Sequence, residues 1–302
     1  MIVRVNRAGL LTTVQDRGRW GYQSRGVPVA GPMDLVSHRL ANAIVGNDAN
    51  SALLEVTLTG PQLEFTDDRM VAVSGAEFEN VPARVAFAVS PARPLIFGPR
   101  LRGARAYVAI SGGIDVPVVL GSRATHLPSA MGGFEGRALK SGDELPLGPP
   151  KGGHYVPTSG VSGLSRTIGT LRVLPGPQRD RFAADALDVL QSAPYRVNAE
   201  SNRVGYRLSG PQLPHVGEAD IISDATPMGS IQVPSSGEPI LLMADRQTTG
   251  GYAKIATVIS ADIPAAGQLA PGDEIRFVVC SPADAVAALK AQEDMLLAVE
   301  RT

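Results

Sequence analysis

The sequence lacks most of the features that mark secreted, membrane-spanning or nucleic-acid-binding proteins. Its 302 residues include one cysteine, Cys280, which cannot form an internal disulfide. No apolar run approaches the roughly 20 residues that cross a bilayer, and the start, MIVRVNRAGLL, has no signal-peptide core. The 28 Lys and Arg residues nearly balance 29 Asp and Glu residues, so no overall field attracts nucleic acid or an anionic membrane. We therefore expect a cytoplasmic protein that recognises its partners locally.

Familiar catalytic motifs are missing too. There is no GxxxxGK[ST] loop, which excludes ATP binding of that kind on this chain. The four histidines are widely separated and HExxH and CxxC are absent, so we predict no metal site. Without GxSxG, a nucleophile of the α/β-hydrolase type has no support. Cys280 lies in an apolar run and is predicted to be a buried, inert thiol.

Composition and pattern instead favour a mainly-β fold. Glycine (33) and proline (24) are frequent, and most apolar runs are short and end at a turn residue. Examples are Val71–Phe78, Arg105–Gly113 and Asp273–Pro282. We predict a few short helices between such strands.

Three segments have helical spacing. In the first, Leu40 and Ile44 share one face, Asp34 can cap the start and Gly46 the end. The last has apolar residues at helical intervals close to the C-terminus. The predicted helices span Met33–Gly46, Pro177–Ser192 and Pro282–Glu300.

The chain also repeats two short phrases. LTGPQLEF (Leu58–Phe65) recurs as LSGPQLPH (Leu208–His215), and LKSGDELPL (Leu139–Leu147) recurs as LAPGDEIRF (Leu269–Phe277). The spacing differs between the halves, which suggests a duplication without a fixed register. A segment rich in Gly, Pro and Ser separates the halves. We predict domains at residues 1–150 and 164–302, joined by a linker or loop at 151–163.

Clusters of polar residues beside glycines are the candidate binding sites. Glycine lets a backbone approach a ligand closely, arginine can hold a carboxylate through two parallel hydrogen bonds, and aspartate can orient that arginine. The alternative is a set of loops whose Asp and Arg residues only pair with one another. The candidates are Gln15, Asp16, Arg19, Asp34, Ser122, Arg123, Asn202 and Arg203.

Segments along nearly the whole chain match the signature of one family. They include TTVQDRGRWGY, GVPVAGPMD, LEVTLTGPQLEF, GGFEGRALKSGDEL, SNRVGYRLSGP and ADRQTTGGY. In order, and from roughly Ile2 to Val279, the chain resembles the biotin-dependent carboxyltransferase family, also called allophanate hydrolase subunit 2-like. It is most similar to the branch formed by the 5-oxoprolinase C subunits (KipA-like). The resemblance implies two cyclophilin-like β-barrel domains.

The resemblance also implies an activity and partners. It implies ATP-dependent opening of 5-oxo-L-proline to L-glutamate, together with a B subunit (allophanate hydrolase subunit 1-like) and an A subunit (LamB/YcsF-like). ATP would then act through the complex. The chain has no Met-Lys-Met attachment site, so we do not expect biotin on it. Two alternatives stay open: a carboxyltransferase acting on urea or another amide with a separate biotin carrier, and a KipA-like regulatory module that binds without chemistry.

The phrase DRQTTGGY is the predicted catalytic segment. It lies between predicted strands Ile240–Met243 and Ile255–Ile259 and is longer than a plain hairpin needs. A small lactam or urea-like substrate requires donors for its carbonyl and carboxylate. Asp245, Arg246 and Gln247 are the predicted catalytic residues, with Asp245 either orienting Arg246 or acting as base. The remaining residues are predicted to bind substrate, unless the segment is only a structural loop: Thr248, Thr249, Gly250, Gly251 and Tyr252.

Overall fold

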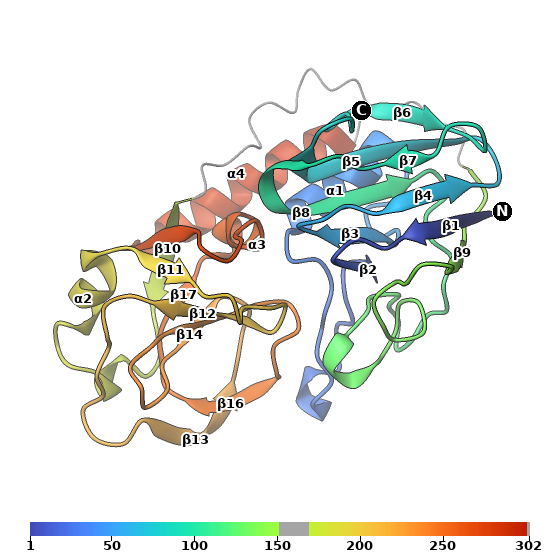
Figure 1. Ribbon diagram of the computed structural model, residues 1–302. Coiled ribbons are helices and arrows are strands. Elements are labelled where there is room, and N and C mark those ends of the chain that lie inside the picture. The colour runs from blue at the N-terminus through green and yellow to red at the C-terminus, as the bar shows by residue number, and fades with distance from the viewer. Residues whose placement is uncertain (151–168, 301–302) are drawn as a thin grey trace. The chain divides into compact units, whose positions relative to one another are not determined.

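The computed structural model describes residues 1–150 and 169–300. The predicted linker, residues 151–163, lies outside the described residues. The chain forms two compact units (Figure 1). Unit 1 contains Met1–Trp20, residues 30–150 and residues 294–300, and unit 2 contains Gly21–Val29 and residues 169–293. Each unit is described separately below.

Unit 1 is built from two antiparallel sheets. One has the strand order β7-β4-β1-β9 and the other β2-β3-β8-β5-β6. The strands are β1 (Ile2–Arg7), β2 (Leu11–Gln15), β3 (Leu53–Thr57), β4 (Gln62–Phe65), β5 (Arg69–Phe78), β6 (Ala86–Val89), β7 (Leu95–Ile96), β8 (Arg100–Ile110) and β9 (Glu144–Pro146).

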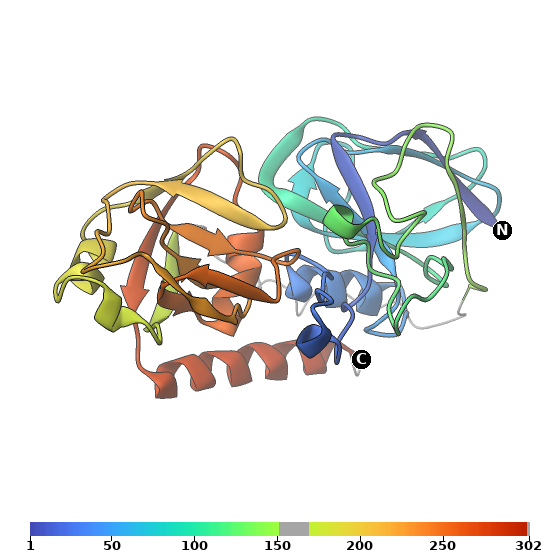
Figure 2. The same ribbon diagram turned by 90° about the horizontal axis from the view of Figure 1, so that it is seen from below.

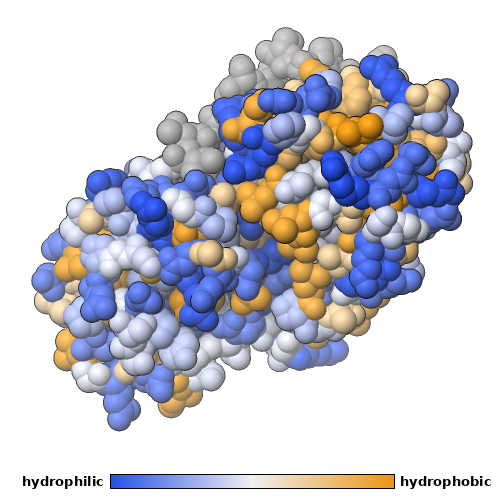
Figure 3. Space-filling view, viewed as in Figure 1, coloured by the Kyte–Doolittle hydropathy of each residue, from blue (hydrophilic) through white to orange (hydrophobic). Residues whose placement is uncertain are grey.

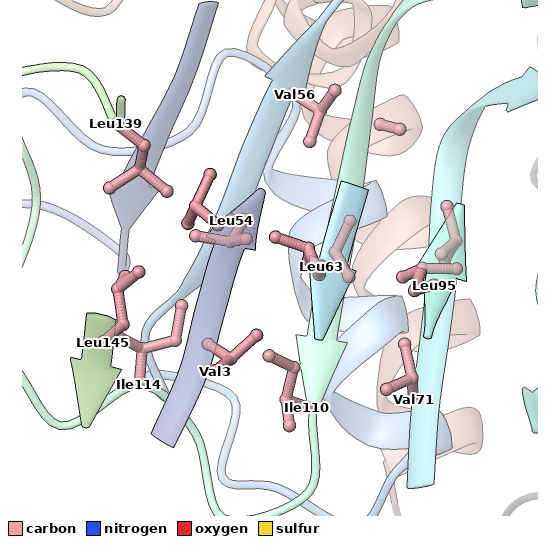
Figure 4. Packing of buried hydrophobic residues seen from close by; sticks show 14 of the residues in the cluster. Val3, Leu54, Val56, Leu63, Val71, Leu95, Ile110, Ile114, Leu139 and Leu145 are labelled. Atoms are coloured by element: carbon pink, nitrogen blue, oxygen red, sulfur yellow. The ribbon is translucent and has the colours of Figure 1, made fainter. Parts of the chain in front are cut away.

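The core of unit 1 lies between these two sheets. Alternate side chains of each strand point inward, as the period of two in a strand requires. Val3 and Leu63 come from one sheet, Leu54 and Ile110 from the other, and all are at most 2% exposed. Figure 4 shows them packed together with Leu145 of β9. This apolar contact fixes which face of each strand is turned towards solvent or towards the helix.

Helix α1 (Leu35–Ile44) covers the other face of the five-stranded sheet. Leu40 and Ile44 pack there among residues of β3, β5 and β8, as their spacing predicts. The side chain of Asp34 accepts a hydrogen bond from the backbone N–H of Ser37, so it is an N-cap. Gly46 follows the helix with a positive φ of 71°.

Unit 2 is a closed barrel with the strand order β10-β17-β14-β15-β12-β11-β18. A separate two-stranded ribbon, β13 with β16, lies beside it (Figure 1). The barrel strands are β10 (Thr170–Pro175), β11 (Tyr195–Val197), β12 (Gly205–Ser209), β14 (Ser230–Gln232), β15 (Ile240–Leu242), β17 (Lys254–Val258) and β18 (Glu274–Val279); the ribbon strands are β13 (Asp220–Ala225) and β16 (Thr249–Tyr252). A mainly-β fold, as predicted, is therefore confirmed.

Two of the remaining helices differ from each other in how well the sequence predicts them. The C-terminal helix α4 (Pro282–Glu300) is confirmed and is one continuous helix (Figure 2). The prediction for Pro177–Ser192 is wrong in its first half, because only Ala186–Ser192 is α-helical (α2). Phe182 there is extended and forms a β-bridge with His215, whose ring lies 4.6 Å away, so a tertiary contact overrides the helical pattern.

The other helices are short. They are α3 (Ile263–Gly267) and the 3₁₀ turns η1 (Gln23–Arg25), η2 (Leu127–Ser129), η5 (Arg179–Arg181) and η6 (Ser260–Asp262). No helix in residues 1–150 or 169–300 is long and apolar enough to span a membrane. Cys280 is half-buried just after β18, and burial raises the pKa of its thiol.

The repeated Gly-Asp phrase forms the same turn in each unit. Gly142 and Gly272 both have a φ of 92°, which favours glycine. Asp143 Oδ2 accepts a hydrogen bond from the backbone N–H three residues earlier at 2.7 Å, and Asp273 Oδ2 does so at 2.8 Å. The two phrases therefore share a backbone geometry as well as a sequence, which supports a duplication.

Candidate functional site

The predicted catalytic segment, Asp245–Tyr252, is not one loop. Its second half is strand β16, which pairs antiparallel with β13 through Asp224 and Gly250 and through Ala225 and Thr249. The prediction of a loop is therefore wrong over this half. The ribbon stands outside the barrel sheet, so its strands carry no alternating apolar pattern that could reveal them.

Asp245 and Arg203 form a buried ion pair at the start of this segment. Arg203 donates from Nε to Asp245 Oδ2 at 3.0 Å and from Nη2 to Oδ1 at 2.9 Å. Both side chains are at most 3% exposed, and the backbone N–H of Asp245 donates to the Arg203 carbonyl at 2.8 Å. The Asp245 carboxylate therefore contacts Arg203, and its predicted role in orienting Arg246 or acting as base stays a prediction. We infer a bracing role for this pair.

Arg246 is the cationic residue of the segment Asp245–Tyr252. Its Nε donates to the Thr226 carbonyl at 2.6 Å and its Nη1 to the Met243 carbonyl at 3.3 Å. Burial lowers the pKa of its guanidinium to about 10, so it stays protonated at neutral pH. In the described part of the chain no carboxylate forms an ion pair with it. A partly desolvated guanidinium of this kind is suited to hold a carboxylate or a developing oxyanion.

The side-chain amides of Gln247 and Gln232 connect this segment to β14. Gln247 donates from Nε2 to Gln232 Oε1 at 3.4 Å, and Gln232 Nε2 donates to the Tyr252 carbonyl at 3.2 Å. The Thr226 hydroxyl donates to the Gln247 carbonyl. A Cβ at Gly250 would lie 2.6 Å from Gln232 Nε2, so the absence of a side chain there is what accommodates the buried amide. Gln232 and Thr226 are functional candidates that we did not select from the sequence.

A buried lysine links the ribbon to the barrel. Lys254, 2% exposed at the start of β17, donates from Nζ to Asp224 Oδ2 at 2.9 Å. Gln178 donates to the same oxygen at 3.0 Å and accepts from the Lys254 backbone N–H at 3.1 Å. Hydrogen bonds from Lys254 and Gln178 lower the pKa of Asp224 to about 2. In the sequence Lys254 directly precedes the mostly apolar stretch IATVI, and a lysine there is the signal that could have pointed to this group.

The other predicted residues of unit 2 have more local contacts. Asn202 Oδ1 accepts from the backbone N–H of Val204 at 2.8 Å, which is a turn-stabilising contact. The Thr248 carbonyl accepts from the Thr226 backbone N–H at 3.1 Å. Thr249 is exposed on β16. Gly251 leaves room for a Cβ, since its nearest neighbour would be 3.6 Å away.

In unit 1, Asp16 gathers the predicted residues Ser122 and Arg123. Its Oδ1 accepts from Ser122 Oγ at 2.6 Å and from the Gly18 backbone N–H at 2.9 Å, and its Oδ2 accepts from the Arg123 backbone N–H at 2.6 Å. The Arg123 guanidinium donates to Asp115 Oδ1 at 2.8 Å. The structure thus brings these residues together as a support for two loops.

Gln15, Arg19 and Asp34 are also occupied by internal contacts. Arg19 is fully buried and donates to the carbonyls of Val119 at 3.0 Å and Ala124 at 2.9 Å. Gln15 donates from Nε2 to Thr13 Oγ1 at 3.0 Å and to the Thr125 carbonyl at 3.1 Å, and Asp34 caps α1. These contacts are what the alternative of purely structural polar loops requires, and substrate binding by these residues stays a prediction.

The structure therefore connects Asp16 with Ser122 and Arg123 in unit 1 and Arg203 with Asp245 in unit 2, and we take the segment around Arg246 as the candidate site. Within residues 1–150 and 169–300 no set of three His, Cys, Asp or Glu side chains is placed to hold a metal ion.

Comparisons with known proteins agree with the sequence resemblance. The family model "Carboxyltransferase domain, subdomain A and B" matches residues 25–279. The chain belongs to this carboxyltransferase family. It is 40% identical to the 5-oxoprolinase C subunit of Escherichia coli (strain K12), over 97% of this chain and 95% of that protein. It is 36% identical to urea amidolyase of Lachancea kluyveri, over 92% of this chain and 17% of that protein. The crystal structure of K. lactis urea amidolyase matches 99% of this chain and 20% of its own, at 33% identity and a TM-score of 0.90.

Proposed function

We propose that this chain is the C subunit of a 5-oxoprolinase-type complex, which opens 5-oxo-L-proline to L-glutamate with the use of ATP. The observation that carries the proposal is the end-to-end match to a 5-oxoprolinase C subunit, which extends over 97% of one chain and 95% of the other. Urea amidolyase matches through only 17% of its length. The bacterial relative is one subunit of its enzyme, so we assign the partners as a B subunit (allophanate hydrolase subunit 1-like) and an A subunit (LamB/YcsF-like).

The group around Arg246 fits the chemistry of this substrate. 5-Oxoproline carries a carboxylate and a lactam carbonyl, and both need hydrogen-bond donors when they leave water. Arg246 offers a charged fork whose Nε and Nη1 are already held by two carbonyls. The amide of Gln247, exposed beside it, can donate to the lactam oxygen. We assign Arg246 to the carboxylate or oxyanion and Gln247 to orientation of the ring.

Arg203 and Asp245 are positioning residues in this proposal. Their buried pair holds the turn from which Arg246 and Gln247 extend. A preformed set of donors stabilises the transition state but cannot drive the opening of a stable lactam. ATP supplies that driving force when it is bound, and we place it on the partner subunits, since this chain has no phosphate-binding loop motif.

A second candidate function is carboxyl transfer to an amide. The family model and the TM-score of 0.90 to urea amidolyase favour it. In that case a separate protein would carry biotin, because this chain lacks the Met-Lys-Met site. Arg246 would then stabilise the oxyanion of the carboxylated amide.

Reconstitution separates the two functions. The chain would be mixed with the A and B subunits, 5-oxoproline and ATP, and glutamate would be measured with each protein omitted in turn. We expect ATP-dependent glutamate release that requires all three proteins. No glutamate from the full mixture, together with carboxylation of urea when a biotin carrier and its carboxylase are added, would establish the second function instead.

A further inference from the structure

Strand β13 leaves one edge of the ribbon open. In the part of the chain that the structure describes, β13 pairs only with β16, and the two form a sheet of their own. Figure 1 shows β13 as the outer strand of this ribbon at the periphery of unit 2. The backbone N–H and C=O groups of an unpaired strand edge are a template for a further strand.

The side chains of β13 are turned to solvent along almost its whole length. Ile222, at its centre, is 95% exposed, and Tyr252, opposite Asp220 on β16, is 41% exposed. Val216, just before the strand, is 62% exposed. Figure 3 shows small apolar groups among hydrophilic residues over this part of unit 2. An extended segment that paired with β13 could cover Ile222 while satisfying the open edge.

The charge of the β13 segment itself indicates which kind of segment could pair with it. Residues 216–226 (VGEADIISDAT) contain three carboxylates and no Lys or Arg. Lys254 neutralises one of them, Asp224. Glu218 and Asp220 are exposed, and neither forms an ion pair within the described residues. A second copy of β13 would bring like charges together, whereas a basic segment would be complementary.

We propose that β13 is a docking edge for an extended, basic segment of the B-type partner protein, which adds a third strand to the ribbon. This inference rests on the proposed function for the identity of the partner. It also connects the partner with the candidate site, because Thr226 directly follows β13. The Thr226 carbonyl accepts from Arg246 and its hydroxyl donates to Gln247. A strand bound to β13 would thus fix the residue that supports both donors.

The test uses the full chain with the B-type protein. Binding would be measured by isothermal titration for Ile222→Ser and Asp220→Lys, with Val278→Ser as a matched control on β18, where the side chain is 44% exposed. We expect the Kd of each β13 variant to rise about tenfold or more, as it does when central interface residues are changed. The Kd of the control should stay within about twofold of the wild-type value. Binding of the wild type should weaken as the salt concentration rises. Binding of the double variant Glu218→Gln/Asp220→Asn should depend less steeply on salt. Amide exchange of residues 220–225 should slow in the wild-type complex.

The outcomes separate this inference from the proposed function. The docking edge would be overturned, and the proposed function left intact, by an active complex with two properties. Its Kd would be the same for the β13 variants as for the wild type, and amide exchange of residues 220–225 would not slow when the complex forms. Light scattering that shows a dimer of this chain, abolished by Asp220→Lys or Ile222→Ser, would assign the edge to a second copy and also overturn the inference. If the wild-type chain and the B-type protein do not associate at micromolar concentration, both proposals are wrong.

Discussion

The carboxylate of Asp245 is bound to the guanidinium of Arg203 by two hydrogen bonds of 3.0 and 2.9 Å, in an environment from which solvent is excluded. The residue after it, Arg246, has no carboxylate partner among the described residues and donates to backbone carbonyls. In the function we propose, these two adjacent residues have separate roles: Asp245 stabilises the turn through Arg203, and Arg246 presents the charge to the substrate.

Loss of the Arg203–Asp245 ion pair should lower the free energy of unfolding. Asp245→Asn leaves the Arg203 guanidinium buried without its counter-charge, and removing one partner of such a pair costs about 3–5 kcal/mol. Urea unfolding of the chain would measure this. The matched control is Glu200→Gln, which removes an exposed pair with Arg207 at 3.5 Å and should cost less than about 1 kcal/mol. An Asp245→Asn variant as stable as the control, but catalytically dead, would instead restore Asp245 as a base.

Acid should destabilise unit 1 through His38. Burial lowers the pKa of this imidazole from 6.5 to about 4, and its Nε2 lies 3.3 Å from the Gln15 carbonyl. The unfolded chain therefore binds this proton more readily than the folded chain, and stability falls as the pH drops from about 6.5 towards 4. Between pH 7.5 and 5 the wild type should lose about 2 kcal/mol more than His38→Gln. Urea unfolding at both pH values checks this, and equal losses in the two proteins would contradict it.

The two glycines of β16 should tolerate alanine differently. Gly250→Ala would place a Cβ 2.6 Å from Gln232 Nε2, whereas the nearest atom to a Cβ at Gly251 is 3.6 Å away. Because the end of a glutamine side chain can move, we expect Gly250→Ala to fold but to displace Gln232 from the Tyr252 carbonyl. The kcat/KM of the reconstituted complex should drop about five- to tenfold, about 1–1.4 kcal/mol, and Gly251→Ala should stay within about twofold. Equal kcat/KM values for the two variants would contradict a role of Gln232 in the site.

The features that could be predicted from the sequence are those that depend on residues close together in the chain. Asp34 caps α1 because an aspartate before an apolar stripe can satisfy the first N–H groups of a helix. The Gly142-Asp143 turn and its counterpart in unit 2 likewise depend on residues within three positions of one another. The family could also be identified from phrases spread along the chain, and the family model confirms it.

Contacts between residues far apart in the chain could not be predicted from the sequence. Arg203 and Asp245 are 42 positions apart in the chain, and Gln178 and Lys254, which share a hydrogen bond, are 76 positions apart. Nothing in the order of residues states that the Asp245 carboxylate contacts Arg203. The pairing of β13 with β16 was also missed, because two polar strands outside the barrel sheet show no periodic pattern.

The central claim is that Arg246 is the charged group that holds the substrate, and Arg246→Lys tests it most directly. Lysine keeps a positive charge but loses the two-pronged geometry of the guanidinium. In the complex reconstituted with the A and B subunits, we predict that kcat/KM for ATP-dependent glutamate release from 5-oxoproline falls about ten- to a thousandfold, equivalent to about 1.4–4 kcal/mol, while the melting temperature and partner binding stay close to wild type. A folded Arg246→Lys variant that turns over 5-oxoproline at the wild-type rate would contradict the account.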